Sequence, residues 1–367
     1  MKNSALLLLI ALVMLVSCQK DEREEVTIVP PINFEDCDYK TDVSAPEGFT
    51  VNSIAKIDFD GTIRSFQFVN DQVGYALGSR NFGGFVAVFK TTDGGNTWTD
   101  LDVDIDQYPR NMVFKDENFG IISVHDVTGC PPPNCLNKCV ILKTENGGQD
   151  WEEVELEGLN GILYHPQYDK EGNLYANLNL NDEYVIMKST DDGASWSIFY
   201  NYQEFRFSST TYSFKIFEDK LYVSGRDNKI YVINTNQELV KTIDIIGSPV
   251  WDVEIIDENN MVATVSGVAM QSTDGGTSWT TTYNQSARII GFDSVDKGLM
   301  LLTKDYCPSD VFMANDVIAA TNDGGTSWNE APETTTNLGI NFANSQKMGA
   351  GVWYFIADNT LIEVVEN

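Results

Sequence analysis

Short runs of apolar, β-favouring residues separated by polar turns recur along the chain from about residue 49 to its end. Runs such as 85–89 and 184–187 are too short for a helix and are rich in Val, Ile, Phe and Tyr. Gly, Asp and Asn bound them, and these residues favour tight turns. The pattern therefore predicts an all-β protein built from many short strands.

Five of these runs lead into one recurring motif. It reads Ser or Thr, any residue, Asp or Asn, two residues that include glycine, two further residues, and Trp. Asp and Asn accept hydrogen bonds from nearby backbone amides, glycine tolerates positive φ, and Trp covers the base of a hairpin. We therefore interpret the motif as a structural turn. Its key residues are Asp93 and Trp98, Asn146 and Trp151, Asp191 and Trp196, Asp274 and Trp279, and Asp323 and Trp328.

The spacing of the motif predicts how many sheets the chain forms. Successive key positions lie 45 to 53 residues apart, except for a gap of 83 between Asp191 and Asp274. Strand-like runs at 212–217, 221–224 and 229–233 fill that gap with a repeat that lacks the motif. Three strands near 338–343, 350–357 and 360–365, joined by residues 49–58, make a last sheet that closes a ring. The prediction is a seven-bladed β-propeller, or a six-bladed one if the C-terminal strands are an appendage.

The motif resembles the Asp-box of sialidase-like propellers. Phe and Gly also recur six residues apart at 68 and 74, 114 and 120, and 292 and 298. Together the two patterns resemble the repeats of photosystem II stability/assembly factor-like propellers over about residues 60–365. This resemblance implies a scaffold or binding protein.

The residues argue against sialidase chemistry. Sialidases carry an Arg-Ile-Pro signature in the first blade, whereas Arg64 is followed by Ser65 and Phe66, and the signature occurs nowhere in the chain. His165 has no partner in the sequence that indicates a nucleophilic triad. We expect a non-catalytic protein without a cofactor or metal. A glycan-active enzyme is the alternative.

Three arginines are candidate ligand-binding residues. Arg64, Arg110 and Arg288 each lie four residues before the matched Phe, which predicts one structural position in blades 1, 2 and 6. Their guanidinium groups would face one arc of the channel mouth, where a planar fork suits a carboxylate or sulfate. Alternatively, each arginine pairs with a local acid at a blade junction. Trp251 would add an aromatic wall or serve blade packing.

Cysteines predict disulfides in an exported chain. Cys130, Cys135 and Cys139 lie in an insertion at about 125–139 of blade 2, and Cys307 lies in a corresponding insertion at 303–315 of blade 6. Cys37 lies near the N-terminus. A zinc site with His125 is an alternative, but the spacing fits no standard structural site. Because loops on a rigid scaffold often carry binding, the face with these insertions is a candidate binding surface.

The N-terminus predicts export and anchoring. Lys2 and the apolar run 5–16 are typical of a signal peptide over residues 1–17, and the run is too short to span a bilayer. Residues 15–18 resemble a lipoprotein lipobox, which implies lipidation of Cys18; an ordinary signal peptide is the alternative. The acidic segment 19–25 resembles a surface-export signal or is a solvated tether. We expect a tether over 18–48, a propeller over 49–367, and an outer-membrane lipoprotein exposed at the cell surface.

Net charge narrows the class of partner. The chain carries 54 acidic and 24 Lys and Arg residues, a formal charge of −30, which repels nucleic acid and anionic membrane surfaces. We therefore expect membrane contact only through the lipid anchor. The expected function is a protein- or glycan-binding or assembly module, and a structural subunit of an outer-membrane complex is a further alternative.

Overall fold

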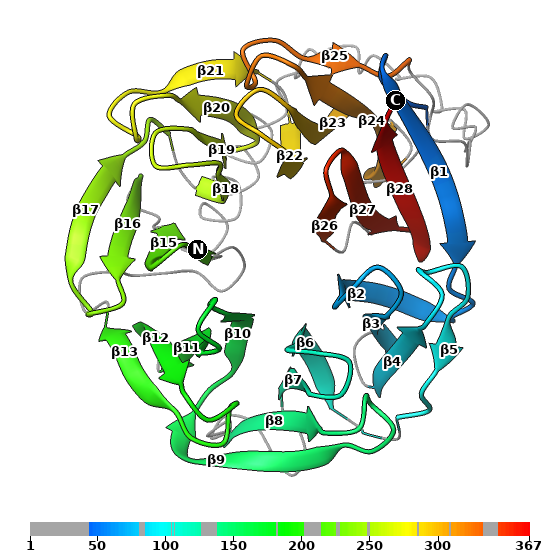
Figure 1. Cartoon of the computed structure of the whole chain (residues 1–367), viewed down its shortest axis with the longest axis vertical. Helices are drawn as coiled ribbons and strands as arrows, with labels where there is room; N and C mark the ends of the chain where they lie inside the picture. The colour runs from blue at the N-terminus through cyan, green and yellow to red at the C-terminus, as the bar shows by residue number, and fades with distance from the viewer. Residues whose placement is uncertain are drawn as a thin grey trace, which may run out of the picture. The chain divides into compact units, whose positions relative to one another are not determined.

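The computed structural model describes residues 44–80, 85–103, 105, 107–125, 138–180, 183–201, 214–224, 228–247, 250–284, 286–307, 310–332 and 344–367. These residues contain strands and turns but no helix, and so no helix that could cross a membrane. The strands form seven four-stranded antiparallel sheets, arranged as blades around a common axis (Figure 1). The prediction of a seven-bladed β-propeller is confirmed.

Each blade runs from an inner strand at the channel to an outer strand. Blade 1 consists of β2(Gly61–Phe68), β3(Gly74–Arg80), β4(Phe85–Thr91) and β5(Thr99–Asp100). Blade 2 consists of β6(Tyr108–Phe114), β7(Gly120–His125), β8(Lys138–Thr144) and β9(Glu152–Asn160). Blade 3 consists of β10(Leu163–Tyr168), β11(Leu174–Leu180), β12(Glu183–Ser189) and β13(Ser197–Asn201). Blades 4 and 5 consist of β14(Phe214–Phe217), β15(Lys220–Ser224), β16(Lys229–Asn234) and β17(Leu239–Asp244); and β18(Val250–Ile255), β19(Met261–Val265), β20(Val268–Ser272) and β21(Thr280–Tyr283). Blade 6 consists of β22(Ser286–Phe292), β23(Gly298–Cys307), β24(Asp310–Thr321) and β25(Asn329–Glu330), and blade 7 of β26(Ser345–Gly349), β27(Val352–Ala357), β28(Thr360–Glu366) and β1(Phe49–Lys56).

The core lies between neighbouring sheets. Tyr75 of β3 and Phe114 of β6 stack across blades 1 and 2 with ring centroids 3.5 Å apart. Both belong to a buried cluster that also contains Val88 and Val124. Burial of these apolar faces is the main force that holds one blade against the next.

The recurring Phe and Gly positions have a steric role. Phe114 at the end of β6 pairs with Gly120 at the start of β7, and a Cβ on Gly120 would lie 2.4 Å from the Phe114 ring. Phe68 with Gly74 and Phe292 with Gly298 repeat this pairing. Glycine is required because the ring lies directly against the backbone of the second strand.

The ring closes through the N-terminal strand. β1 pairs with β28 as the outer strand of blade 7, and Phe49 packs against Trp353 at 6.1 Å between ring centroids. Closure by residues 49–58 is confirmed, and so is the blade without the motif, which is blade 4. The inner strand of blade 7 is β26, and residues 338–343, where the sequence predicted a strand of this blade, lie outside the described residues. The side chains of Asn344 and Gln346 fix this register by bonding the backbone of β2.

The five motifs form turns between the third and fourth strands of their blades, and we call them Trp turns. In the turn at 272–279, Asp274 accepts hydrogen bonds from the backbone N–H and the hydroxyl of Ser278, at 2.8 and 2.6 Å. The Ser272 hydroxyl donates to Asp274 Oδ1, the oxygen that also accepts the Ser278 N–H, and it accepts a hydrogen bond from Gly276 N–H. Gly276 has a φ of 85°, which explains the glycine. The key carboxylate or amide therefore ties the turn together.

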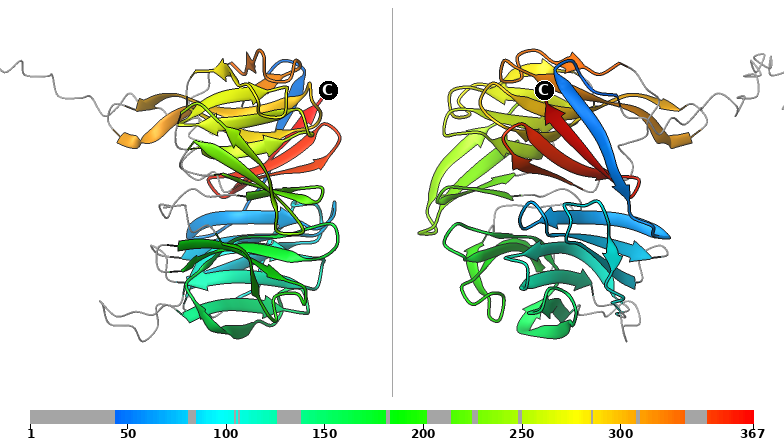
Figure 2. Two further views of the ribbon diagram at one scale, coloured as in Figure 1. Left: turned by 90° about the vertical axis from the view of Figure 1, so that its left-hand side faces the viewer. Right: turned by 45° about the vertical axis from the view of Figure 1, so that its right-hand side comes forward.

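The insertion in blade 6 extends a hairpin of the blade. β23 and β24 remain paired from Gly298 with Thr321 out to Cys307 with Asp310, and their tip extends beyond the other strands of the sheet (Figure 2). The corresponding insertion in blade 2 lies at 126–137, outside the described residues.

Candidate functional site

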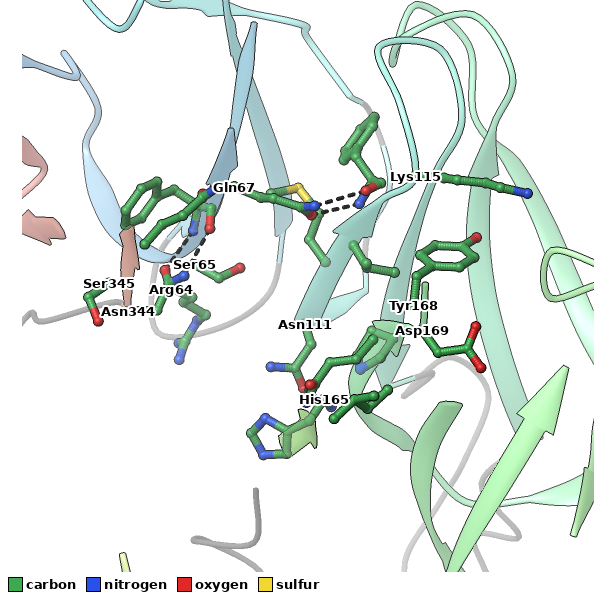
Figure 3. Close-up of a pocket in the computed structure, with 18 of the residues that line it drawn as sticks. Arg64, Ser65, Gln67, Asn111, Lys115, His165, Tyr168, Asp169, Asn344 and Ser345 are labelled. Atoms are coloured by element: carbon green, nitrogen blue, oxygen red, sulfur yellow. Dashed lines mark hydrogen bonds between the residues drawn. The ribbon is translucent and has the colours of Figure 1, made fainter. Parts of the chain in front are cut away.

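A cavity of about 750 Å³ opens at the channel. Its walls are segments of the inner strands β2, β6, β10, β14 and β26 and the residues that flank them. In Figure 3 the side chains of Arg64 and His165 extend towards the same open space, whereas Lys115 extends away from it. The cavity is the candidate functional site because inner strands of five blades meet there.

β-Bulges occur at equivalent points of three inner strands. The pairing of β2 with β3 shifts at Arg64, and the pairing of β6 with β7 shifts at Arg110. The same irregularity occurs at Trp251 in β18, whose side chain lies outside the described residues, so its role as an aromatic wall stays a prediction. A bulge leaves one residue without a partner in the sheet and re-aims its side chain.

Arg288 does not share this position, which corrects the predicted equivalence. In blade 6 the register shifts between Ile289 and Gly291, and Arg288 pairs with Leu301 in the regular ladder. The bulge in β22 lies two residues closer to the matched Phe than in β2. Equal spacing in the sequence therefore does not mean equal position.

Arg64 lines the cavity, whereas Arg110 on the neighbouring inner strand is not one of its lining residues. Arg64 Nε donates to Ser79 Oγ at 2.7 Å, and Arg110 Nη2 donates to His125 Nδ1 at 3.2 Å. Among the described residues neither arginine forms an ion pair, and Arg110 Nε is buried without a hydrogen-bond partner. Burial and then the charge of Arg110 lower the pKa of Arg64. The alternative prediction was that each arginine pairs with an acid at a blade junction. Among the described residues, neither Arg64 nor Arg110 does so.

His165 lines the cavity, and no motif around it in the sequence predicts this position. Its backbone N–H donates to Asn111 Oδ1 at 3.0 Å, and its φ of 53° is unusual for a residue other than glycine. Burial and then the positive charge of Lys215 lower its pKa, while Asp252 opposes this effect. The uncharged imidazole is therefore favoured at neutral pH.

Blades 4 and 5 add a charged group near His165. Lys215 Nζ of β14 lies 3.7 Å from Glu254 Oε2 and 3.9 Å from Asp252 Oδ1 of β18. Asp252 raises the pKa of Lys215, and burial raises the pKa of Glu254. The described part of the channel thus has arginines on blades 1 and 2 and paired charges on blades 4 and 5.

Side-chain amides connect neighbouring inner strands. The carboxamide of Gln67 accepts from Phe114 N–H and donates to Phe114 C=O, at 2.7 and 2.8 Å (Figure 3). Gln346 bonds Phe68 in the same two-point way, and Asn344 bonds Phe66. We call this two-point arrangement an amide clamp. A glutamine directly before the matched Phe, as at Gln67, is the sequence signal that could have predicted the clamp.

Cys139 is a buried free thiol in the structure. It lies in the apolar cluster between blades 2 and 3, and burial raises its pKa to about 12. The structure therefore shows no disulfide at this candidate. Cys18, Cys37, Cys130 and Cys135 lie outside the described residues, as does the side chain of Cys307, so their disulfides and the lipid on Cys18 stay predictions.

Within the described ranges, no group of three or more His, Cys, Asp or Glu side chains could hold a metal ion.

Comparison of the sequence with protein-family models and with curated proteins finds no match. The fold matches many solved structures. One is YCF48 bound to D1 peptide, with a TM-score of 0.63 and 14% identity over 89% of this chain and all of that chain. Another is YCF48 from Cyanidioschyzon merolae, with a TM-score of 0.60 and 14% identity over 85% and 98% of the two chains. The GH74 xyloglucanase from Xanthomonas campestris matches with a TM-score of 0.57 and 12% identity over 85% of this chain and 53% of that chain. At these identities the similarity establishes the propeller fold that this chain shares with them.

Proposed function

We propose that this chain is a non-catalytic, surface-exposed lipoprotein whose propeller binds a segment of a partner protein in the channel cavity. The observation that carries the proposal is Arg64 in the cavity lining, with Arg110 on the next inner strand. Neither arginine has a carboxylate partner among the described residues of this strongly acidic chain. A guanidinium group is a planar, always charged donor suited to carboxylates. The bound segment would therefore carry Asp, Glu or a C-terminal carboxylate.

Two further observations support the proposal. Arg110 Nε is buried without a partner, and a buried donor is stabilised when it gains an acceptor. A similar propeller, YCF48, has been solved bound to D1 peptide. The recurring Trp turns, which we interpret as Asp-boxes, hold the third and fourth strands of their blades together and so help to keep the propeller rigid.

Panning of a random 12-residue peptide library on the full-length protein tests the proposal. We expect the selected peptides to be enriched in acidic residues and to bind the Arg64→Gln variant about tenfold more weakly, because one charge-assisted contact is lost. Arg80→Gln is the matched control, since Arg80 loses the same charge but pairs with Asp100 outside the cavity lining.

Equal binding by the Arg64→Gln and wild-type proteins would contradict the cavity as the binding site. Hydrolysis of a sialoside that disappears in an Arg64→Ala variant would instead support the glycan-active alternative and overturn the non-catalytic proposal.

A further inference from the structure

Between blades 2 and 3, beside the cavity, the equivalent position carries no side-chain amide. Gln67, Val113 and Gln167 occupy the same position in the inner strands of blades 1, 2 and 3, since they pair with Tyr75, Ile121 and Tyr175 in the same register. Gln67 clamps the next blade at Phe114, and Gln167 donates to Phe214 C=O of the next blade at 2.7 Å. Val113 has no polar atom with which to do this.

Tyr168 of blade 3 is equivalent to Phe114 of blade 2, which Gln67 clamps. Val113 stands where Gln67 does, and it offers no amide to clamp the backbone of Tyr168. Phe68, Phe114 and Tyr168 are equivalent, because each lies six residues before its partner at the start of the second strand. In all three blades the following residue donates its N–H back across the turn. In this register the N–H and C=O of the aromatic residue point away from the second strand, as the clamps on Phe68 and Phe114 require.

Other contacts at this junction are retained. Asn111 stands two residues before Val113, as Asn344 stands before Gln346, and it still bonds the His165 N–H. Val113 itself is buried at 7% exposure in the cluster between blades 2 and 3. Val113 and Tyr168 both line the cavity, and the Tyr168 ring lies beside Lys115, whose Nζ is 5.7 Å from the ring centroid (Figure 3). The cavity therefore borders the junction at which the clamp is missing.

We infer that the Tyr168 edge of β10 binds the primary carboxamide of an Asn or Gln side chain of the bound segment; the inference rests on the proposed function. A primary carboxamide presents an N–H and a C=O on the same side, so it can bond the C=O and N–H of one extended residue together. Gln67 and Gln346 show this geometry within the chain. A trans main-chain amide presents its two groups on opposite sides and can make one of these bonds at a time.

The first experiment adds the clamp to the full-length protein. In Val113→Gln, we expect hydrogen exchange of the Tyr168 N–H to slow at least tenfold relative to wild type. Val113→Met is the matched control, because Met has nearly the same length and no amide. Unchanged exchange in Val113→Gln, or equal slowing in both variants, would overturn the inference.

The second experiment uses acetamide as the probe and needs no identified partner. In NMR titrations of the wild-type protein, acetamide should shift the Tyr168 amide signal in a saturable way, and Val113→Gln should abolish the shift. N-methylacetamide and acetate, at the same concentrations, test the main-chain amide and the bare carboxylate. Equal shifts by N-methylacetamide, or acetamide shifts that do not include Tyr168, would contradict a primary-carboxamide site.

A reciprocal variant covers the case in which Val113→Gln does not fold. Gln67→Val removes the clamp on Phe114, so exchange of the Phe114 N–H should accelerate at least tenfold and acetamide should shift its signal. Failure of both effects would refute the equivalence on which the inference depends. The peptide panning tests the proposed function, whereas the acetamide and exchange experiments test the carboxamide site. Failure of the panning alone would therefore refute the proposed function without deciding the result at Tyr168.

Discussion

At the scale of single residues, the second Trp turn contains a compensated exchange. Its key residue is Asn146, whose Nδ2 donates to Asp150 Oδ2 at 2.8 Å while its Oδ1 accepts the Asp150 N–H. In the turn at 272–279, the carboxylate of Asp274 accepts from the hydroxyl of Ser278. In the turn at 272–279 the carboxylate stands at the key position and the donor side chain four residues later, whereas in the second Trp turn this order is reversed. The turn therefore requires one side-chain donor and one carboxylate acceptor at these two positions, in either order.

This exchange predicts that Asp274→Asn destabilises the protein and that Asp274→Asn with Ser278→Asp restores part of the loss. The double variant recreates the donor and acceptor order of Asn146 and Asp150. The thermal midpoints of the wild-type protein, both single variants and the double variant form the cycle that measures the coupling. Additive losses would contradict the compensation.

The same carboxylate predicts a dependence on pH. Its hydrogen bonds, led by that from the Ser278 hydroxyl, lower the pKa of Asp274 from 3.8 to about 2. Because the folded-state pKa lies below the ordinary value, the ionised group stabilises the fold above about pH 4, and this contribution is lost as pH falls through about 2. The difference in thermal midpoint between wild type and Asp274→Asn should therefore shrink from pH 5 to pH 2. A constant difference would show that the charge has no role.

At the scale of elements, β1 supplies the outer strand of the last blade from the start of the propeller. Phe49 is 6% exposed and packs in a buried cluster with Trp353, Phe355 and Leu301. The strand also pairs along its length with β28. Closure of the ring therefore joins residues about 300 positions apart in the chain. The hydrogen bond from Asn52 to Glu363 is one contact across this junction.

Phe49→Ala should reduce the free energy of unfolding by about 3 kcal/mol, because a buried aromatic ring is lost from the closing strand. Phe85→Ala is the control: Phe85 is 42% exposed on β4, so its loss should cost less than about 0.5 kcal/mol. Urea unfolding of the full-length variants measures both values. Similar losses in the two variants would show that closure at β1 carries no particular stability.

At the scale of the whole molecule, the proposed location depends on a residue outside the described part of the chain. Cys18 lies at the end of the predicted signal peptide, and the acidic segment 19–25 follows it. A net charge of −30 opposes binding to anionic lipid headgroups. We therefore expect membrane attachment to depend on acylation.

In bacterial cells that export lipoproteins, Cys18→Ser should abolish incorporation of labelled palmitate and shift the protein from the membrane to the soluble fraction. Cys37→Ser should retain both label and membrane attachment. External protease should cleave the wild-type protein on intact cells if it is exposed at the surface. Labelling of Cys18→Ser at the wild-type level would exclude the predicted anchor site.

The sequence by itself predicted a β-propeller of seven or six blades, the motif-free blade and the closing strand, because turn residues and apolar runs repeat at a blade-length period and act locally. The structure decided for seven blades. Only the tertiary structure decided which residues share the cavity. Equal spacing placed Arg288 with Arg64, but a bulge at a different point of β22 separates them. The contact of Gln67 with Phe114, and the contrast with Val113, depend on the register between strands of different blades. A local motif does not encode that register, since it results from how whole blades pack together.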